Sequence, residues 1–497
     1  MTTRITHFIG GQSWTGTSQR TAPVFNPATG AADKAVDLAS VADVAGAVAV
    51  ASAAFIEWRE ISLTKRIQIL FAFRELLNAR KEELAEIITA EHGKVLSDAL
   101  GEITRGQEVV EFACGLGHLL KGGFSEQVST GVDVHSVRQP LGVVAIISPF
   151  NFPAMVPMWF FPIALAAGNT VILKPSEKDP SAANFIAQLL KEAGLPSGVF
   201  NVVHGDKEAV DALLLHPAVK SISFVGSTPI AQYIYETGTK NKKRVQALGG
   251  AKNHMLVLPD ADLDLAADQA INAGFGSAGE RCMAISVVLA VDPIGNELVR
   301  KIAEKMPQLR IGDGRRGCDM GPLVTGSHRD KVKGYIEAGV RDGAALVVDG
   351  RNPVVDGESG GFWLGPTLFD HVKTDMSIYT DEIFGPVLSV VRVKSYEEGV
   401  ALINAHEFGN GTAIFTNDGG AARRFQNEVE IGMIGINVPI PVPVAYYSFG
   451  GWKSSLFGDT HAHGTEGVHF FTRGKVITSR WLDPSQGGIN LGFPTQS

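Results

Sequence analysis

The chain has 497 residues, which is long enough for about three domains with large cores. Hydrophobic residues make up 45% of it and charged residues 19%, a balance that is typical of folded globular proteins and excludes a disordered one. The formal net charge is −8, from 44 basic and 52 acidic residues without a basic block, which argues against a general nucleic-acid binder.

The cysteines and the apolar segments indicate a cellular location. Cys114, Cys282 and Cys318 are too few and too scattered for a disulfide framework, which favours a reducing compartment. The first residues contain no apolar core of a signal peptide. The longest apolar stretch, residues 154–173, is interrupted by prolines and a glycine, whereas a membrane span needs about 20 uninterrupted apolar residues. We therefore expect a cytoplasmic enzyme or binding protein with no membrane or nucleic-acid partner.

The first part of the chain is predicted to be mainly helical. Ser40 and Asp43 have the spacing of a capping box, and an alanine-rich amphipathic segment follows them towards Trp58. Apolar residues continue at helical spacing through residues 67–77 and 109–112. This stretch is best explained as helical packing.

From residue 143 onward, short β-rich runs alternate with helical ones. This alternation is typical of βαβ units and a mainly parallel sheet. A second βα region extends from about residue 255 to residue 443, and no linker separates the two. The predicted strands cover residues 143–147, 170–173, 200–203, 221–225 and 244–247 in the first region, and 287–291, 345–348, 387–393 and 412–415 in the second.

Four polar residues follow predicted strands at their carboxyl ends, where parallel α/β sheets bind ligands. Asn151, held between prolines, suits an oxyanion hole, although a turn is the commoner role for one asparagine. Lys174 can donate to ribose or phosphate, and Glu177 can accept from a 2′-hydroxyl and repel a 2′-phosphate; the alternative is a solvated strand end. Ser227 precedes a helix whose N–H groups could bind a pyrophosphate, but no G-x-G-x-x-G motif is present.

Cys282 is the candidate nucleophile. A free cysteine is equally often a small buried hydrophobe. Glycines at positions 274, 276 and 279 predict an irregular loop before it, and the neighbouring Arg281 could lower the pKa of its thiol. Cys114 and Cys318 have no comparable surroundings, so we interpret them as structural.

Six motifs, in order, resemble those of the aldehyde dehydrogenase superfamily. They are PFNFP (149–153), GNTVILKPSE (168–177), GLPSGVFNVVHG (194–205), FVGST (224–228), GERC (279–282) and EIFGPV (382–387). The resemblance covers nearly the whole chain. It implies that Cys282 is the nucleophile and Asn151 the oxyanion donor. It also implies contacts with NAD by Phe150, Phe152, Lys174, Glu177, Ser227, Glu382 and Phe384.

The resemblance further implies an α/β fold with three parts. A Rossmann-like NAD domain would comprise residues 1–120 and 141–250, and an α/β catalytic domain residues 251–446. A small β extension for oligomerisation would combine residues 121–140 with 447–497. The family suggests a homotetramer or a homodimer.

One absence indicates the branch of the family. Most hydrolytic members carry Glu-Leu-Gly-Gly-Lys, whose Glu activates water, whereas here Ala247 or Leu248 occupies that place. A thiol needs less activation than water, so coenzyme A becomes the expected acyl acceptor. The segments AKNH (251–254), RCMA (281–284) and YSFGGWKSSLFGD (447–459) are similar to the CoA-acylating methylmalonate-semialdehyde dehydrogenases.

In that branch two arginines are associated with the substrate carboxylate, and the matching positions are Arg105 and Arg281. For Arg105 alone, a surface helix residue is the simpler interpretation. Two alternatives to the CoA-acylating function stay open. One is an ordinary aldehyde dehydrogenase that hydrolyses its thioester, and the other is a non-catalytic protein on the same fold.

Overall fold

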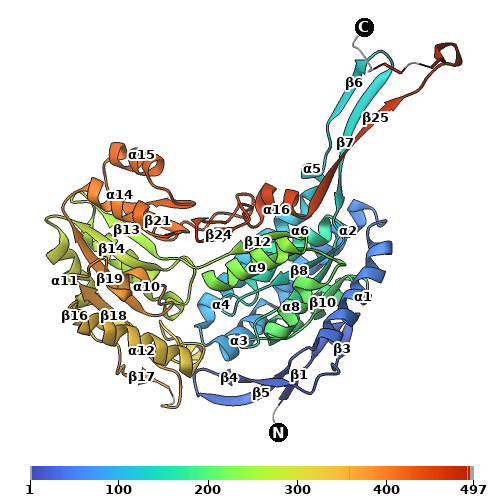
Figure 1. Cartoon of the computed structure of the whole chain (residues 1–497). Helices are drawn as coiled ribbons and strands as arrows, with labels where there is room; N and C mark the ends of the chain where they lie inside the picture. Colours follow the sequence, from blue (N-terminus) through green and yellow to red (C-terminus); the bar gives the residue numbers. More distant parts are fainter. Residues whose placement is uncertain (1–2, 358, 490, 493–497) are drawn as a thin grey trace.

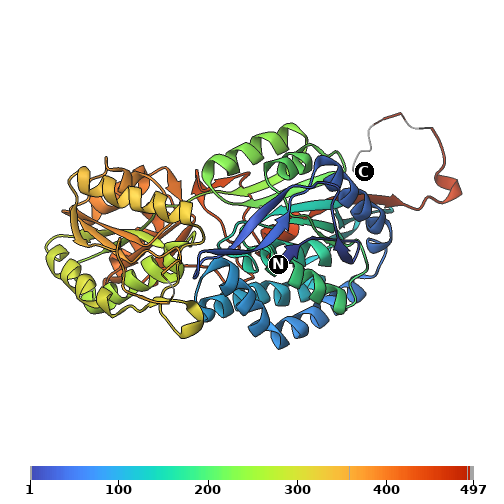
Figure 2. The same ribbon diagram turned by 90° about the horizontal axis from the view of Figure 1, so that it is seen from below.

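The computed structural model describes residues 3–357, 359–489 and 491–492 of the chain. They form two α/β lobes side by side and a narrow three-stranded sheet that projects from one of them (Figure 1 and Figure 2). Each lobe is built on its own sheet, with helices packed against it. The parallel sheets predicted from the alternation of strands and helices are therefore confirmed.

The first lobe contains an eight-stranded sheet with a parallel centre of order β12-β11-β8-β9-β10. Short strands pair antiparallel at both edges. The central strands are almost entirely buried, as expected for a parallel sheet covered on both faces. The strands are β8 (Val143–Ile147), β9 (Thr170–Lys174), β10 (Phe200–Val202), β11 (Val219–Val225) and β12 (Arg244–Leu248), with β2 (His7–Ile9), β3 (Gln12–Trp14) and β24 (Leu456–Phe457) at the edges.

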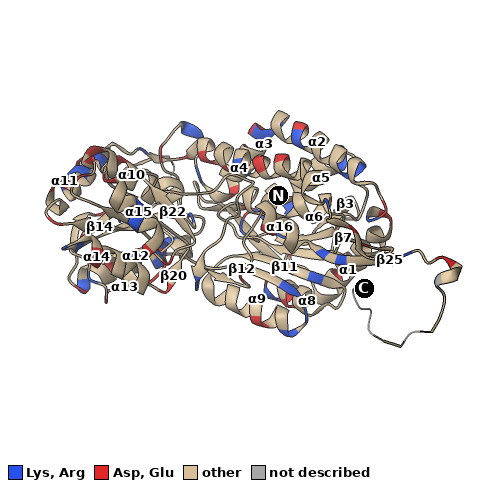
Figure 3. Cartoon of the chain, turned by 90° about the horizontal axis from the view of Figure 1, so that it is seen from above, with Lys and Arg blue, Asp and Glu red and all other residues tan. Residues whose placement is uncertain are grey.

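Helices of the first lobe pack around this sheet, and acidic and basic residues are interspersed along the outer ones (Figure 3). They are α2 (Leu63–Ala79), α3 (Lys81–His92), α4 (Leu96–Cys114), α6 (Met155–Ala166), α7 (Ser181–Glu192), α8 (Lys207–Leu215), α9 (Thr228–Lys240) and α16 (Gly464–Phe470).

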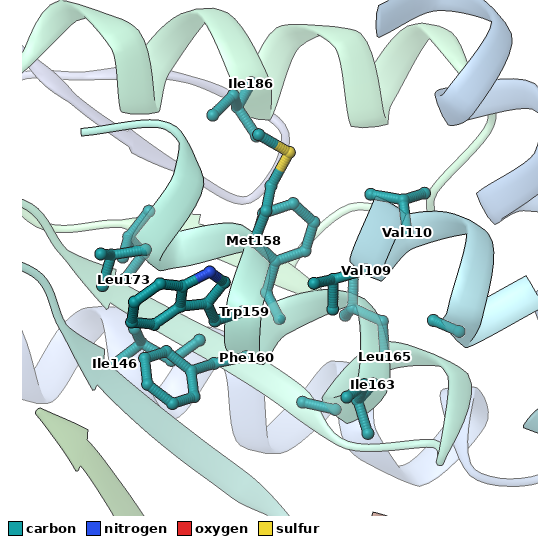
Figure 4. Close-up of a cluster of buried hydrophobic side chains, with 14 of the residues drawn as sticks. Val109, Val110, Ile146, Met158, Trp159, Phe160, Ile163, Leu165, Leu173 and Ile186 are labelled. Carbon is teal, nitrogen blue, oxygen red and sulfur yellow. The ribbon is translucent and has the colours of Figure 1, made fainter. Parts of the chain in front are cut away.

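The apolar stretch of residues 154–173 contains the central helix of this core. All twelve residues of α6 are buried, because the helix lies among α2, α4, α16 and strands β8 and β9. A helix that is apolar on every side is stable only when it is surrounded in this way. Figure 4 shows Trp159 and Phe160 of α6 beside Ile146 of β8, with Val109 of α4 on the other side of the cluster. The prolines and the glycine in this stretch therefore belong to a core helix and the turn after it.

The predicted capping box begins α1 (Val41–Trp58). The Ser40 hydroxyl accepts a hydrogen bond from the Asp43 N–H at 3.2 Å, and the Asp43 carboxylate accepts one from the Ser40 N–H at 2.9 Å. By length and a mean hydropathy of 1.5, α1 is the single described helix that could cross a membrane. In this structure it packs against β8, β9 and α8.

The second lobe has a seven-stranded sheet of order β16-β18-β19-β14-β13-β21-β22, in which β16 alone is antiparallel. Its strands are β13 (Asn253–Val257), β14 (Ile285–Val291), β16 (Ala345–Val348), β18 (Thr367–Asp370), β19 (Val387–Val393), β21 (Gly411–Phe415) and β22 (Met433–Ile436). Its helices include α10 (Leu263–Phe275), α11 (Gly295–Lys305), α12 (Gly326–Arg341), α14 (Tyr396–Ala405) and α15 (Gly419–Glu428).

The projecting sheet has the order β25-β7-β6, all antiparallel, with β6 (Phe124–Ser129), β7 (Val132–Pro140) and β25 (Thr472–Arg480). Residues 447–471, which the prediction placed in this extension, instead pack against both lobes, and β23 (Trp452–Lys453) pairs with β20 (Phe408–Gly409) of the second lobe. Phe449 lies 4.4 Å from Trp159 between ring centroids, and β24 pairs with β12. Burial of these aromatic rings holds the segment on the core. Residues 1–2, 358, 490 and 493–497 of the predicted domains lie outside the described residues.

Candidate active site

A cavity of 560 Å³ lies between the carboxyl ends of the first lobe's strands and loops of the second lobe. This is the place where parallel α/β sheets bind ligands. The structure brings eight of the predicted site residues together in its wall. They are Phe150, Asn151, Lys174, Glu177, Ser227, Cys282, Glu382 and Phe384.

Cys282 lies on an irregular loop immediately before β14. Ser277, Ala278 and Gly279 have φ values of 53°, 52° and 75°, so three consecutive residues adopt the left-handed conformation. The loop predicted from the glycines is therefore present. A Cβ at position 279 would collide with the carbonyl oxygen of Gly385, so only glycine fits there.

The thiol of Cys282 is in an environment that favours its neutral form. Burial raises its pKa to about 12, and the charge of Glu382 adds to the effect. Hydrogen bonds from the backbone N–H groups of Cys282 and Met283 lower the pKa of the thiol. The charge of Arg281 also lowers it, by the smallest amount. Arg281 donates to Asp98 at 2.6 Å. The predicted lowering of the thiol pKa by Arg281 is thus outweighed by burial, because its charge is already paired.

Asn151 is held from behind by a buried ion pair. Lys94 Nζ donates to the Asn151 carbonyl oxygen at 2.6 Å and to Glu102 at 2.7 Å. The Glu102 carboxylate also accepts hydrogen bonds from the N–H groups of Ala154 and Met155, at 2.9 and 3.1 Å. The PFNFP loop is therefore fixed at its middle residue and directly after its last one, while the Asn151 amide makes no hydrogen bond with another described residue. Sequence reasoning missed Lys94 and Glu102, because only their burial marks them.

At one end of the cavity, cationic and anionic groups lie beside a helix N-terminus. Lys174 Nζ donates to the Gly205 carbonyl at 2.8 Å and lies 3.6 Å from Glu177. Burial lowers the pKa of Lys174, and the Glu177 charge partly offsets that effect. Ser227 is the N-cap residue of α9, but its side chain makes no capping bond, so it does not satisfy the first N–H groups of the helix.

At the other end, Glu382 is held by the segment that joins the lobes. Its carboxylate accepts a hydrogen bond from the Ala251 N–H at 2.9 Å, and burial raises its pKa to about 7. Lys252 Nζ donates to the carbonyl oxygens of Ile378 and Asp381 at 2.9 and 2.7 Å, which fixes the turn before Glu382. Burial also lowers the pKa of Lys252 to about 7.

Phe384 forms an aromatic wall with Phe150. Their ring centroids are 5.8 Å apart in an edge-to-face arrangement. Phe384 has a φ of 56°, and its carbonyl oxygen lies 2.7 Å from His328 Nε2. His328 also lines the cavity, and sequence reasoning missed it because it lies mid-chain in no recognised motif. These contacts hold Phe384 in a conformation that a non-glycine residue rarely adopts.

Three predicted residues do not line this cavity. Phe152 lies in the hydrophobic core, with Lys94 Nζ 4.2 Å from its ring centroid, so its assignment to the cofactor is corrected. Arg105 is exposed on α4 and pairs with Glu108 at 3.1 Å. Arg281 lines a small adjoining pocket that also contains Cys282. Arg281 is tied to α4 through Asp98, two turns from Arg105 on the same helix.

The position of the missing water-activating carboxylate is filled by apolar side chains. Ala247 and Leu248 are the last residues of β12, both are buried, and both pair with β24. Among the described residues, the carboxylates that line the cavity are Glu177, Asp206 and Glu382. Of these three, Glu382 is the carboxylate whose charge raises the pKa of Cys282. A base at position 247 or 248 is therefore ruled out by residue type.

Comparison with known proteins places this architecture in a family. The model of the aldehyde dehydrogenase family matches residues 14–477. The chain is 57% identical over 492 residues to a malonate-semialdehyde dehydrogenase from Pseudomonas aeruginosa, covering 98% of this chain and 99% of that protein.

Solved structures agree. A methylmalonate-semialdehyde dehydrogenase from Oceanimonas doudoroffii has a TM-score of 0.96 and 54% identity, covering 98% of this chain and 99% of that one. A Sinorhizobium meliloti protein solved in complex with NAD also has a TM-score of 0.96, with 52% identity, and covers 98% and 100%. The fold predicted from the six motifs is confirmed, and the chain belongs to the aldehyde dehydrogenase family.

Proposed function

We propose that this enzyme oxidises a malonate-type semialdehyde with NAD and transfers the acyl group from Cys282 to coenzyme A. The placement of Ala247 and Leu248 carries the proposal, because no carboxylate from β12 can activate water beside the thioester. The relatives named malonate- and methylmalonate-semialdehyde dehydrogenase support the choice of substrate.

The residues of the cavity fit NAD. Lys174 and Glu177 offer a cation and a carboxylate suited to a ribose, and the uncapped N-terminus of α9 at Ser227 suits a pyrophosphate. Glu382 and Phe384 lie at the other end, beside Cys282, where the second ribose and the ring would be held. NAD, when bound, supplies the hydride acceptor.

Cys282 and Asn151 have different roles in the proposed reaction. The Cys282 thiolate adds to the aldehyde carbon, and the Asn151 amide with the Cys282 N–H stabilises the oxyanion. Loss of hydride leaves a thioester on Cys282. The malonyl-type acyl group then loses carbon dioxide, and the α-carbon that keeps the electron pair of the broken bond takes a proton from water. The coenzyme A thiolate then attacks the thioester carbon. The bond from that carbon to Cys282 Sγ breaks, and the thiolate of Cys282 returns.

The substrate carboxylate has two candidate partners. Arg281 precedes the nucleophile, and its side chain is 21% exposed and paired with Asp98. Arg105 lies two turns from Asp98 on α4, and its contact with Glu108 is at the surface. A guanidinium binds a carboxylate through two parallel hydrogen bonds, so either arginine can select an acidic semialdehyde over a plain one.

The test is NADH formation from malonate semialdehyde or methylmalonate semialdehyde, with and without coenzyme A, and with products identified by mass. We expect strong dependence on coenzyme A, with acetyl-CoA or propionyl-CoA and carbon dioxide as products. Cys282→Ala should abolish NADH formation, whereas Cys318→Ala, the matched change at a buried thiol outside the cavity, should retain it. Turnover without coenzyme A that yields a free acid would overturn the proposal.

That contrary outcome would favour the hydrolytic alternative, with Glu382 as the base. Its carboxylate lines the same cavity and has a pKa raised to about 7, a value suited to a general base. The hydrogen bond from the Ala251 N–H holds one of its oxygens, which argues against free movement towards water.

We also propose that the chain assembles as a homo-oligomer, a tetramer or a dimer, through its extension, and works in the cytoplasm. Strand β25 is an edge strand, and Phe124, Val476 and Trp481 expose 67%, 70% and 91% of their surface. Apolar side chains on an open edge favour pairing with a second chain. Light scattering should give a multiple of the chain mass, and Val476→Glu should lower it. A wild-type monomer would overturn the proposal.

A further inference from the structure

The carbonyl oxygen of the nucleophile's own residue accepts hydrogen bonds from two buried asparagines. Asn253 Nδ2 lies 2.9 Å from the Cys282 oxygen, and Asn410 Nδ2 lies 3.0 Å from it. The two asparagines expose only 2% and 4% of their surface. Neither lines the 560 Å³ cavity, although Asn253 lines the small pocket beside Cys282.

The sheet of the second lobe brings the two amides to one point. Asn253 is the first residue of β13, and Asn410 precedes β21, which pairs with β13 in parallel. The loop of Cys282 leads into β14, the neighbour of β13 on its other side. Three adjacent strands therefore begin beside the Cys282 carbonyl.

Further hydrogen bonds lock both amides in place. Asn253 Oδ1 accepts a hydrogen bond from the Gly411 N–H at 3.0 Å, and its Nδ2 also donates to the Ala284 carbonyl at 2.9 Å. Asn410 Nδ2 lies 3.1 Å from the sulfur of Met283 as well. A Cβ at Gly411 would lie 2.6 Å from the end of the Met283 side chain, which would then have to shift.

From this geometry we infer that Asn410, together with Asn253, is a positioning residue for the nucleophile, and this inference deepens the proposed function, on which it rests. The two amides hold the Cys282–Met283 peptide by its carbonyl, so that the N–H of the same peptide faces the thiol.

The planarity of the peptide bond explains how the clamp acts. In a trans peptide the carbonyl and the N–H point in opposite directions, so two donors on the oxygen fix the direction of the Met283 N–H. That N–H and the one of Cys282 hydrogen-bond to the thiol and oppose the effect of burial on its pKa. Two donors on the carbonyl also polarise the peptide, which strengthens its N–H as a donor.

The strained loop before Cys282 makes such a clamp necessary. Three consecutive residues, 277–279, have positive φ, and such conformations persist only where the surroundings over-determine them. Without the Asn410 amide, the Cys282–Met283 peptide can rotate towards a commoner conformation. The folded protein would then keep its cysteine but lose the orientation of the N–H that stabilises the thiolate.

The test is the pH dependence of Cys282 alkylation by iodoacetamide in the free enzyme, read at the Cys282 peptide by mass spectrometry. We expect Asn410→Ala to slow alkylation about tenfold at pH 8 and to move the profile to higher pH, since a shift of one pKa unit changes the thiolate fraction tenfold. Asn410→Ser should do the same, because the hydroxyl is too short to reach the carbonyl. It serves as the second variant if Asn410→Ala does not fold.

Asn404→Ala is the matched control. Asn404 Nδ2 donates to a backbone carbonyl of the same lobe, that of Glu428 at 2.7 Å, and not to the carbonyl of Cys282. Its alkylation profile should equal that of the wild type. A folded Asn410 variant with the wild-type rate and profile would overturn the inference. Alkylation requires neither aldehyde, NAD nor coenzyme A, so failure of the proposed function leaves this result unaffected, and the reverse also holds.

Discussion

Lys94 Nζ lies 2.7 Å from the carboxylate of Glu102, and both side chains are completely buried. The same ammonium group donates to the carbonyl oxygen of Asn151, and the same carboxylate accepts from the N–H groups that follow the PFNFP loop. The pair therefore joins α4 and the segment between α3 and α4 to the loop of the proposed oxyanion donor.

Lys94→Met should destabilise the protein and impair catalysis together. Removing one partner leaves the Glu102 carboxyl buried without its cation, and breaking a buried pair in this way costs about 3–5 kcal/mol. The Asn151 loop also loses its anchor, so kcat should fall. Urea unfolding and steady-state NADH formation measure the two effects. Arg300→Met removes an exposed ion pair with Glu304 and should leave the free energy of unfolding and kcat nearly unchanged. A Lys94→Met variant with equally small changes would show that Lys94 does not anchor the Asn151 loop.

Glu280→Gln should make stability less dependent on pH. Burial raises the pKa of Glu280 from 4.5 to about 8, so between these values the folded state binds a proton that the unfolded state has lost. The contribution of this group to the free energy of unfolding is therefore largest below pH 4.5, and it is lost as the pH rises from 4.5 through about 8. The melting temperature of the variant minus that of the wild type should therefore increase from pH 5 to pH 8.

The groups next to Glu280 do not stabilise its ionised form. His92 Nε2 and His328 Nε2 lie 3.8 and 3.6 Å from its oxygens, and burial lowers the pKa of both histidines, so neither supplies a full positive charge at neutral pH. Glu304→Gln, at an exposed carboxylate, is the matched control. Its difference in melting temperature from the wild type should not change between pH 5 and pH 8. A constant difference for Glu280→Gln as well would show that its carboxyl is ionised in the folded state.

Much of the fold follows from periodicity alone. The run Val143–Ile147 is continuous and apolar, so it indicates a strand buried on both faces, and the structure places it at the centre of a sheet. Ser40 and Asp43 indicate a helix start for a local reason, since a capping box depends on residues three apart. Residues 447–471 were misplaced, because the pairing of β24 with β12 is a long-range contact that no local pattern encodes.

Some residues of the site could likewise be predicted from local sequence patterns, and others could not. Cys282 and Asn151 lie in motifs with glycines or prolines that constrain the backbone, and both are in the cavity wall. Asn410 has no such signal, because its role depends on two strands that begin side by side. Phe152 shares a motif with Phe150, yet it points into the core, because the chain bends at residues 150–152 and residues two apart therefore do not face the same side.

Gly279→Ala should abolish activity while the protein still folds. The new methyl group would collide with the Gly385 carbonyl, and the φ of 75° is unfavourable for alanine. The loops of Cys282 and Phe384 must then separate, so kcat should fall about a hundredfold or more, as expected when reacting groups are misplaced by about 1 Å. NADH formation and circular dichroism test this. Gly46→Ala, in open space on α1, should retain full activity; equal activities would show that the two loops can separate without consequence.

Arg105→Leu should lower kcat/KM for an acidic semialdehyde but not for a plain aldehyde. If Arg105 binds the substrate carboxylate, kcat/KM for malonate semialdehyde should fall about tenfold or more, since a charged hydrogen bond is worth about 1.5–3 kcal/mol, while that for propanal stays unchanged. Arg105 is now paired with Glu108 at the surface, so the substrate would have to compete with that contact. Arg473→Leu, at an exposed arginine of β25, is the control. Equal losses on both aldehydes, or no loss on either, would remove Arg105 from the substrate site. Arg281, beside the nucleophile, would then be the group that recognises the carboxylate.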